Sequence, residues 1–558
     1  MEGTKTDVPY FKIKEGTIYS SLVEGDLPIL DRVLSIKHPK AQQIKFAAFK
    51  KHNRLWAAQW DGRVRFLKRP SNKFPSGLLR VLPELLEMNG FPKFTIDIIP
   101  SIRRIDIPED LLDLIDKNFL NGIELYPYQI QAIKDLLREN RGVAHCATNA
   151  GKTEIATAIV KFITTFLKEV AGKSNTIFMV NTLDLLYQTK DRIKLRWPEA
   201  DVGLVGHGIF DGDKDIVVAT AQTLSRKLSS KNPEEKYKCK ELLEKTTILL
   251  LDECHHTQSD TWKDISYSCY AMFRYGFSGT AFNREGLEGF RNFELMSVTG
   301  RKLASVRNKF LIEEGYSAKP VIYFQSVGEK EKNLDIKSAP IHPLPRTPCQ
   351  VLQGKTLIDG IFLRRESVDG KKTGRSFVSI NRKEELISSD YVITKCYYDL
   401  AIVGYAPRNE SIVLWAQKFQ EENKPALIII KKRVHGRVLE IMLKKAGLKV
   451  QFVWGQTDPR KRIKARKKLS DGKLDALIAT SIFDEGVDAP SIRAMIIAAA
   501  SSSYDKNLQR IGRGLRKKKE DNTVSIVDFV DFQNQHTLKA SLARLEDYES
   551  EEFTIESC

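Results

Sequence analysis

The sequence lacks the features that carry a protein into or across a membrane. No apolar run approaches the ~18 residues that a membrane helix needs. The first residues, MEGTKTDVPYFKIKEG, carry charge but not the apolar core of a secretory signal. The seven cysteines are scattered and none stands in a CxxC pair, which argues against a zinc site and a disulfide framework. We expect a chain that has no membrane partner. We also expect it in a reducing cytoplasm, which is that of the host if a phage encodes the protein.

Positive charge, in contrast, is in excess. Lys and Arg total 89 against 71 Asp and Glu, which gives a formal net charge of +18. A polyanion is the commonest partner of such a surface, because each neutralised phosphate releases counterions. Net charge alone does not distinguish a surface that binds a polyanion from a basic surface that is merely soluble.

Short apolar runs alternate with longer amphipathic stretches from residue 141 onward, and they form two sets. Runs of this kind are typical of parallel strands that helices cover on both faces. We therefore predict an α/β fold class with two parallel-sheet lobes. The first set is GVAHCAT, TIFMVN, DIVVAT, TILLLDE and YGFSGT, and the second is ALIIIKK, VQFVWG, ALIATS, AMIIAA and VSIVDFV.

Two further regions differ from this pattern. Residues 329–389 are polar and rich in Gly, Pro and Lys, and they read as an insertion of loops or hairpins near the start of the second lobe. Near the N-terminus, RLWAAQWDGRVRFLKR predicts a hairpin that turns at Asp61-Gly62. Its Arg63 and Arg65 would share one face, as a nucleic-acid contact or as a solvated strand face.

The segment CATNAGKTE follows a predicted strand and opens a predicted helix. Such a loop directs backbone N–H groups at phosphates, Lys152 adds a positive charge, and the Thr153 hydroxyl would hold Mg²⁺. Cys146 replaces the first Gly of the usual pattern, and Asn tolerates the left-handed backbone expected at the loop. The residues expected around the nucleotide here are Asn149, Ala150, Gly151, Lys152 and Thr153.

Two further segments carry the groups that phosphoryl transfer needs. In LLLDECHH, Asp252 would orient Mg²⁺ and Glu253 would polarise the attacking water. In QRIGRGLRKKK, arginines three residues apart would share one face of a helix and reach a phosphate, with a solvated basic helix as the alternative. The catalytic candidates in that segment are Gln509, Arg513 and Arg516. The basic stretch KRIKARKKL (461–469) also predicts a helix. Its charge favours a helix that faces phosphates over one that faces only solvent.

In this order the segments resemble the motifs of superfamily 2 helicases of the DExH type, over residues 125–531. The resemblance implies two RecA-like lobes, with Tyr126 and Gln129 of YPYQIQAI at the adenine. It implies that Gly486 and Asp488 of IATSIFDEGVDAP lie near the nucleotide. The residues that it implies at nucleic acid are Thr182, Gln222, Thr223, His435, Gly436 and Thr480.

QWDGRVRFLKR, FPSGLL and EGYSAKPVI are similar to segments of UvsW-like helicases of large phages and, for the last, of their XPB-like relatives. This resemblance implies an ATP- and Mg²⁺-dependent DNA helicase or translocase that moves 3′ to 5′ and remodels forks and junctions. We expect a monomer that binds single-stranded and branched DNA. The expected domains are a small α+β DNA-binding domain (1–105), an ATP-binding lobe 1 (106–310) and lobe 2 (311–558).

Other functions remain open at this point. The same motor could act on RNA or serve as a duplex translocase subunit, because backbone contacts dominate in each case. A non-catalytic nucleic-acid binding protein with a relic nucleotide site is the alternative from another class.

Overall fold

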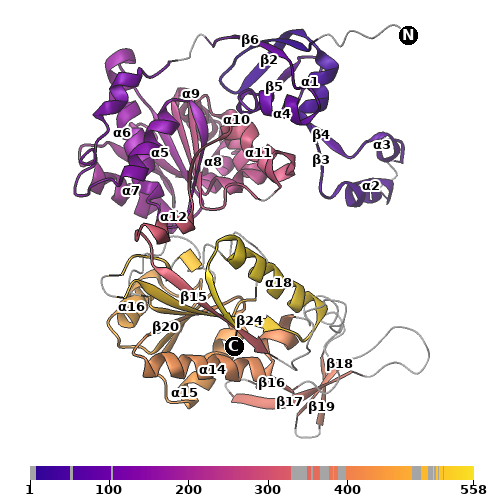
Figure 1. The fold of residues 1–558 in the computed structure, drawn as a ribbon, viewed down its shortest axis with the longest axis vertical. Helices are drawn as coiled ribbons and strands as arrows, with labels where there is room; N and C mark the ends of the chain where they lie inside the picture. The colour runs from indigo at the N-terminus through magenta and orange to yellow at the C-terminus, as the bar shows by residue number, and fades with distance from the viewer. Residues whose placement is uncertain are drawn as a thin grey trace. The chain divides into compact units, whose positions relative to one another are not determined.

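The structure is a computed structural model, and it forms two compact units, residues 1–307 and 308–558, each described here by itself (Figure 1). The described residues are 8–50, 54–101, 105–283, 285–327, 348–353, 356–364, 376–380, 383–387, 398–480, 492–500, 507, 511–512, 514–518 and 521–557. Among them, no helix is long and apolar enough to cross a membrane.

The N-terminal part of the first unit is a small α+β domain. Its sheet has the order β5-β2-β1-β6, and alternation along β1 buries Phe11 and Ile13. The domain docks on α11 (Phe290–Thr299), where a Cβ added to Gly77 would lie 2.1 Å from the Met296 carbonyl oxygen. Its other elements are β1 (Tyr10–Lys14), β2 (Tyr19–Gly25), α1 (Leu27–Val33), β5 (Lys73–Pro75), η1 (Ser76–Leu78), α4 (Leu82–Met88) and β6 (Thr95–Ile99).

The predicted hairpin at Asp61-Gly62 is wrong. A helix, α3 (Arg54–Gln59), precedes the turn, and β4 (Arg63–Arg65) pairs instead with β3 (Ser35–Lys37). The helix α2 (Ala41–Lys50) completes the segment between these two strands. Gly62 still provides the turn, with φ of +81°.

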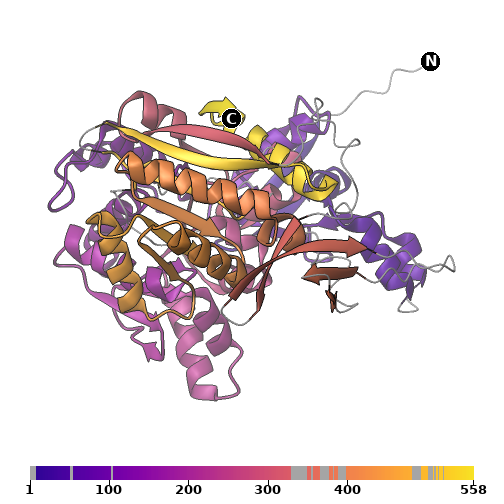
Figure 2. The ribbon, with the colours of Figure 1, turned by 90° about the horizontal axis from the view of Figure 1, so that it is seen from below.

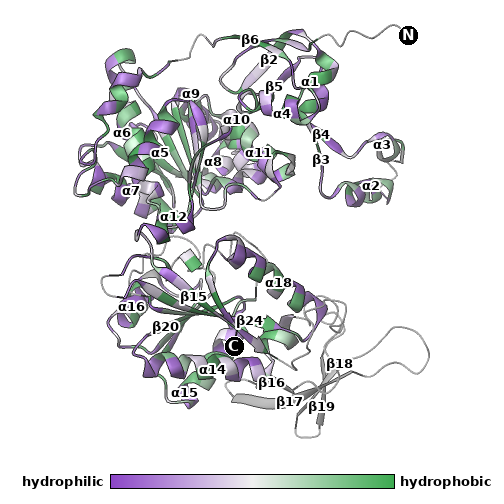
Figure 3. Cartoon of the chain, in the orientation of Figure 1, coloured by the Kyte–Doolittle hydropathy of each residue, from purple (hydrophilic) through white to green (hydrophobic). Residues whose placement is uncertain are grey.

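Lobe 1 is built on a sheet that has, within the described residues, eight strands in the order β10-β9-β11-β8-β12-β13-β7-β14. The strands pair in parallel except β10, and all five predicted runs of the first set are among them. Figure 3 shows the hydrophobic character of this sheet in green. The strands are β7 (Arg141–Cys146), β8 (Thr176–Val180), β9 (Val202–Gly206), β10 (Ile209–Phe210), β11 (Ile216–Thr220), β12 (Ile248–Asp252), β13 (Phe273–Ser278) and β14 (Lys302–Val306).

Helices cover both faces of this sheet, as the both-sided apolar strands predict. Helices α8 to α11 share one buried core with the strands, and Figure 1 shows α5, α6 and α7 on the other side. The helices are α5 (Pro127–Leu137), α6 (Lys152–Ala171), α7 (Leu183–Arg196), α8 (Ala221–Leu228), α9 (Pro233–Lys245) and α10 (Asp260–Ser268), with short turns η2 (Glu109–Leu114), η3 (Cys254–Gln258) and η4 (Gly286–Glu288).

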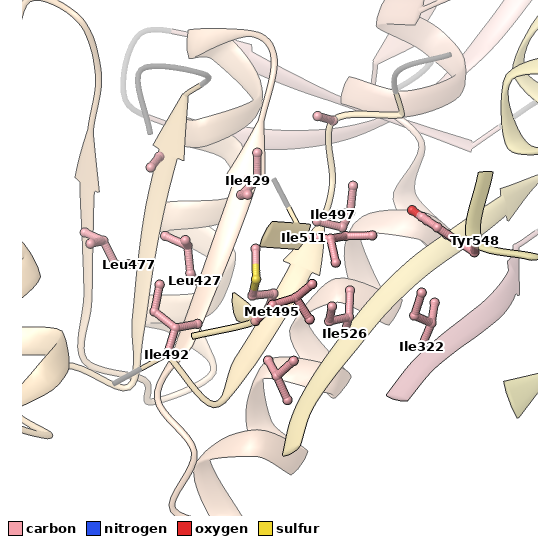
Figure 4. Packing of buried hydrophobic residues seen from close by; sticks show 14 of the residues in the cluster. Ile322, Leu427, Ile429, Leu477, Ile492, Met495, Ile497, Ile511, Ile526 and Tyr548 are labelled. Atoms are coloured by element: carbon pink, nitrogen blue, oxygen red, sulfur yellow. The ribbon is translucent and has the colours of Figure 1, made fainter. Parts of the chain in front are cut away.

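Lobe 2 has a second parallel sheet, of order β21-β22-β20-β23-β24-β15-β25, and apolar clusters on both of its faces. Figure 4 shows one of these clusters, in which Met495 and Ile526 of neighbouring strands lie close together. Helix α14, orange in Figure 2, lies along the sheet. The strands are β15 (Lys319–Val327), β20 (Ala426–Ile430), β21 (Val450–Val453), β22 (Ala476–Thr480), β23 (Ala494–Ile497), β24 (Thr523–Asp531) and β25 (Thr554–Ser557). The helices are α12 (Asn308–Glu313), η6 (Asp399–Val403), α14 (Ala406–Glu421), α15 (Arg433–Lys445), α16 (Pro459–Ser470) and α18 (Gln535–Ser550).

The predicted α/β fold with two RecA-like lobes is therefore confirmed, and so are the five strands of the second set and the helix over KRIKARKKL. The polar insertion contains a separate antiparallel sheet of order β16-β17-β18-β19. Its strands are β16 (Pro348–Gln353), β17 (Thr356–Arg364), β18 (Ser376–Ile380) and β19 (Lys383–Ile387).

A network of buried charges fastens α14 and α18 to β24 in lobe 2. The Arg544 Nε donates to Asp528 Oδ2 at 2.7 Å, and the Arg408 Nε donates to Asp531 Oδ1 at 2.8 Å. All four side chains are fully buried. Burial raises the pKa of Asp531, although Arg408 and Arg544 oppose this shift. The network is stable only as a set, because removing one partner leaves a buried charge unpaired.

We expect Arg544→Ala to destabilise lobe 2 by about 3–5 kcal/mol, because it leaves Asp528 without its guanidinium partner. Urea unfolding followed by tryptophan fluorescence measures the loss. Lys539→Ala, at an exposed position of the same helix, is the control and should change stability by less than about 0.5 kcal/mol. An unchanged unfolding midpoint for Arg544→Ala would show that the network does not hold the lobe together.

Candidate nucleotide and nucleic-acid sites

The edge of the lobe 1 sheet at which its parallel strands end gathers the chemistry-bearing segments. Strands β7, β13 and β12 are neighbours, so the residues that follow them meet at this edge. The loop after β7 leads into α6, Ser278 ends β13, and Asp252 ends β12. The fold thereby brings the loop after β7 together with two segments that follow it about a hundred residues later in the chain.

The loop between β7 and α6 contains two residues in the left-handed conformation directly before a long helix. Asn149 and Gly151 both lie in the left-handed region, with φ of 79° and 77°, and Lys152 is the first residue of the 20-residue helix α6. Successive N–H groups in such a turn, at the positive end of a helix dipole, form a concave anion site. Asn149 takes the left-handed conformation that asparagine was expected to tolerate in this loop.

Gln129 of α5 fastens this loop from the side. Its Oε1 accepts a hydrogen bond from the Tyr126 backbone N–H at 2.9 Å, and its Nε2 donates to the Ala150 carbonyl oxygen at 3.0 Å. The Tyr128 hydroxyl donates to the same carbonyl at 3.3 Å. A Cβ added to Gly151 would lie 2.2 Å from the Gln129 Nε2, so the close contact requires glycine there. Tyr126 is 43% exposed and stacks on Tyr128, which leaves an aromatic face beside the loop.

Glu253 is held in place between a cation and a hydroxyl. It adopts a left-handed conformation (φ 51°), and its Oε1 lies 3.7 Å from the Lys152 Nζ. The Ser278 hydroxyl donates to its Oε2 at 2.8 Å. Burial by itself would raise the pKa of Glu253, but Lys152, His255 and the Ser278 hydrogen bond together lower it. The carboxylate is therefore ionised near neutral pH, as a group that orients water must be.

The segment FSGTAF brings β13 against the phosphate loop. A Cβ added to Gly279 would lie 3.3 Å from the Cys146 carbonyl oxygen and 3.4 Å from the Thr148 nitrogen. A side chain at this position would crowd the loop. Ser278 also lies 3.0 Å from the His255 Nδ1, so this hydroxyl links the carboxylate to the histidine. Ser278, His255 and Tyr128 were not predicted as site residues, although they lie in the segments YGFSGT, LLLDECHH and YPYQIQAI.

The nucleic-acid candidates of lobe 1 follow β8 and β11, which are neighbours in the sheet. Thr182 caps α7 by accepting from the Leu185 N–H at 3.3 Å, and the exposed Gln222 donates to Asn181 at 3.2 Å. Thr223 is only 7% exposed and accepts a hydrogen bond from the Thr220 hydroxyl. Gln222 is therefore the most accessible of these three candidates.

The arginines expected at the hairpin are engaged within the N-terminal domain. Arg63 donates to the Ser35 carbonyl oxygen at 2.6 Å and to its hydroxyl at 2.9 Å, and so joins β4 to β3. Arg65 donates to the Asp61 carboxylate at 2.6 Å, and this hydrogen bond lowers the pKa of Asp61.

In lobe 2, the expectation that His435 contacts nucleic acid is corrected. The side chain is fully buried and its Nε2 lies 3.0 Å from the Asn409 Oδ1. Burial, aided by Arg408, lowers the pKa of His435 to about 3, so the imidazole is neutral. Gly436 is also buried, and a Cβ added to it would lie 2.5 Å from the Phe452 ring. Thr480 ends β22 and is 9% exposed.

The arginine segment of lobe 2 is described in part. Arg516 forms an isolated β-bridge with Ser317, so the predicted helix does not extend through this residue. The candidates Gln509, Arg513, Gly486 and Asp488 lie outside the described residues.

Lobe 1 combines a phosphate loop with an acidic pair, and Ser278 of the neighbouring strand is bonded to one of these acids. This combination defines the class of nucleotide hydrolases built on RecA-like lobes. Comparisons with known proteins narrow this class. The family model described as "Type III restriction enzyme, res subunit" matches residues 122–283. The model described as "Helicase conserved C-terminal domain" matches residues 410–518.

Two curated relatives span most of the chain. The DNA 3'-5' translocase XPB2 of Sulfurisphaera tokodaii is 25% identical over 75% of this chain and 84% of its own length. The ATP-dependent DNA helicase uvsW of Enterobacteria phage T4 is 24% identical over 85% of this chain and 82% of its own. The crystal structure of T4 UvsW aligns over 98% of both chains at 18% identity with a TM-score of 0.39. With these domains and relatives, the chain is an ATP-hydrolysing superfamily 2 helicase, similar to UvsW and XPB2, that acts on nucleic acid.

We expect Gln129→Ala to raise the KM for ATP about tenfold, since it removes a buried hydrogen bond that holds the loop at Ala150. Steady-state ATP hydrolysis measures this change. Gln131→Ala, on the exposed face of the same helix, is the matched control and should keep the normal KM. A normal KM for Gln129→Ala would mean that the loop keeps its shape without the clamp.

Proposed function

We propose that the chain is an ATP-dependent DNA helicase or translocase that moves 3′ to 5′ and remodels branched DNA such as forks and junctions. The observation that carries the catalytic part is the contact of Lys152 and Ser278 with Glu253, which holds an ionised carboxylate at the phosphate loop. The choice of DNA and of polarity is supported by the names of the two curated relatives, a DNA helicase and a DNA 3'-5' translocase.

In this proposal backbone N–H groups between Asn149 and Thr153 bind the β- and γ-phosphates, except that of Ala150, which donates to the Ala147 carbonyl oxygen at 3.1 Å. Lys152 neutralises part of the phosphate charge. Glu253 orients a water molecule in line with the γ-phosphate and accepts its proton as the oxygen attacks. The phosphate then leaves ADP, and Ser278 keeps Glu253 in position. Tyr126 offers its exposed ring to the adenine, while Gln129 supports the loop.

Mg²⁺ is part of the proposal, and the donors at the loop suit it. Thr153 offers a hydroxyl and Asp252 a carboxylate, which are the hard oxygen ligands that Mg²⁺ prefers together with water and substrate phosphates. Within the residues that the structure describes there is no cluster of three His, Cys, Asp or Glu side chains able to hold a metal. We propose that the ion arrives together with the nucleotide and would supply positive charge at its phosphates.

The remaining roles rest on the sequence motifs. We propose that Gln509, Arg513 and Arg516 stabilise the transferred phosphate and that Gly486 and Asp488 lie near the nucleotide. Gln222 and the backbone around Thr182, Thr223, Gly436 and Thr480 would hold one strand by its phosphates, largely without reading bases. The protein would act as a monomer.

We expect Lys152→Ala to lower the kcat for ATP hydrolysis at least about a hundredfold, since it removes the positive charge at the phosphates. Glu253→Gln should bind ATP with near-normal affinity but not turn it over, because the amide cannot accept the proton. A coupled ATPase assay and fluorescent-nucleotide binding separate these results. Lys161→Ala, on α6 but bonded to the Phe119 carbonyl, is the control for helix damage. Normal turnover by Lys152→Ala would refute the assignment of the loop.

The substrate is tested by ATP hydrolysis of the whole chain with single-stranded DNA, a model fork, a four-way junction and RNA. We expect stimulation by DNA, greatest for the fork and the junction. Stimulation by RNA alone would refute the choice of DNA and leave the motor in place. No turnover with any of them would instead favour a binding protein with a relic nucleotide site.

A further inference from the structure

Residues 38–50 and 54–62 form a small helical projection, here called the head, that the nucleotide site does not use. The head contains α2 and α3 and connects β3 to β4, and Figure 1 shows it beyond these strands, away from the N-terminal sheet. Its base is fixed to lobe 1, because the His38 ring lies 4.7 Å from that of Phe290 and the Phe66 ring lies 4.9 Å from that of Phe293. The head is thus carried on a rigid support.

The chain that leads through the head is strongly basic, and Asp61 at the end of the head is its one carboxylate. Between Asp31 and Asp61 the sequence contains no Asp or Glu. The same stretch holds seven cationic side chains, Arg32, Lys37, Lys40, Lys45, Lys50, Lys51 and Arg54. A segment without a single carboxylate has a strong positive potential, which favours a polyanion.

The same head exposes large apolar side chains that no core covers. Ala41 is the one residue of α2 that is buried among those described, whereas Phe46 is 62% and Phe49 52% exposed. On α3, Trp56 is 42% exposed and stacks on Trp60 with 5.0 Å between ring centroids. Exposed aromatic groups of this size on a projecting helix pair are typical of a binding surface.

Cations and aromatics are interleaved on α2. At 3.6 residues per turn, Lys45, Phe49, Phe46 and Lys50 follow one another round one side of the helix. The Lys50 ammonium lies 4.6 Å from the centre of the Phe46 ring. Helices that lie on membranes separate an apolar face from a charged one, which this helix does not do. Alternating rings and cations suit a strand whose bases stack while its phosphates pair with lysines.

We propose that the head binds single-stranded nucleic acid, with bases stacked on Phe46, Phe49 and Trp56 and phosphates paired with Lys45 and Lys50. This inference rests on the proposed function and adds to it a second contact for an unpaired strand, outside the two lobes. Duplex DNA keeps its bases stacked on one another, so the aromatic groups select for the unpaired strand.

The test is the affinity of the whole chain for a fluorescent oligothymidylate and for a blunt duplex of the same length, over a range of salt. We expect Trp56→Ala, and separately Phe46→Ala with Phe49→Ala, to weaken binding of the single strand at least about fivefold. Duplex binding and the salt dependence should not change. Lys45→Gln with Lys50→Gln should instead reduce the slope of log K against log salt by about 1.4, or ~0.7 for each phosphate contact.

Matched variants keep the result interpretable. Tyr237→Ala removes an aromatic side chain that is 67% exposed on α9 and should bind like the wild type. Trp56→Phe should retain most of the affinity, because it keeps a ring for stacking. Equal thermal unfolding temperatures show that each variant is folded.

Three results would overturn the inference. Unchanged affinity of the aromatic variants for the single strand would exclude stacking, and an equal loss for duplex would indicate contact with phosphates alone. If these variants lose binding to vesicles of anionic lipid but keep the single strand, the head is a membrane contact. The proposed function fails separately: a wild-type chain whose ATP hydrolysis responds to no DNA refutes the proposed function, whereas DNA-stimulated hydrolysis with unchanged variant affinities refutes the head alone.

Discussion

The left-handed turn through Asn149 and Gly151 is the constraint on which the nucleotide site depends. It lies between the end of β7 and the start of α6 at Lys152. The turn has little room to change. Gln129 lies against Gly151 on one side, and Gly279 lies against the Cys146 and Thr148 backbone on the other. The loop is therefore shaped by protein contacts before any nucleotide arrives, and the cost of ordering it is met during folding.

The same contacts connect the site to the N-terminal domain. Ser278 touches Glu253, and a few residues later the chain enters α11, on which the domain docks. Phe290 and Phe293 of α11 contact the base of the head at His38 and Phe66. The Glu253 carboxylate and the head are thus connected through β13, η3 and α11. A movement at one end of this connection can change the other end only if the connecting elements have two discrete arrangements. Variants of α11 would test whether such arrangements exist.

Much of the fold could be predicted because the strands of both sheets are apolar on both faces, as ALIIIKK and TILLLDE are. The phosphate loop and the acidic pair could also be proposed from the sequence, because each is a short run of consecutive residues. The contact of Gln129 with Ala150 could not be read, because it joins residues 21 apart through tertiary packing. The RLWAAQW segment was taken for a strand since its polarity alternates, but it forms α3 and leaves Trp56 exposed. His435 was misplaced because the rotation of α15 about its axis decides which side chains are buried, and a motif does not reveal it.

The central claim is that the loop, clamped by Gln129, receives the phosphates of ATP. The structure of the whole chain with a non-hydrolysable ATP analogue and Mg²⁺ tests it most directly. The account predicts the γ-phosphate within hydrogen-bonding distance of the Lys152 Nζ and the loop N–H groups, with Gln129 still bonded to the Ala150 carbonyl. An analogue bound away from residues 149–153, or a loop that has released Gln129 and refolded around the phosphates, would contradict it.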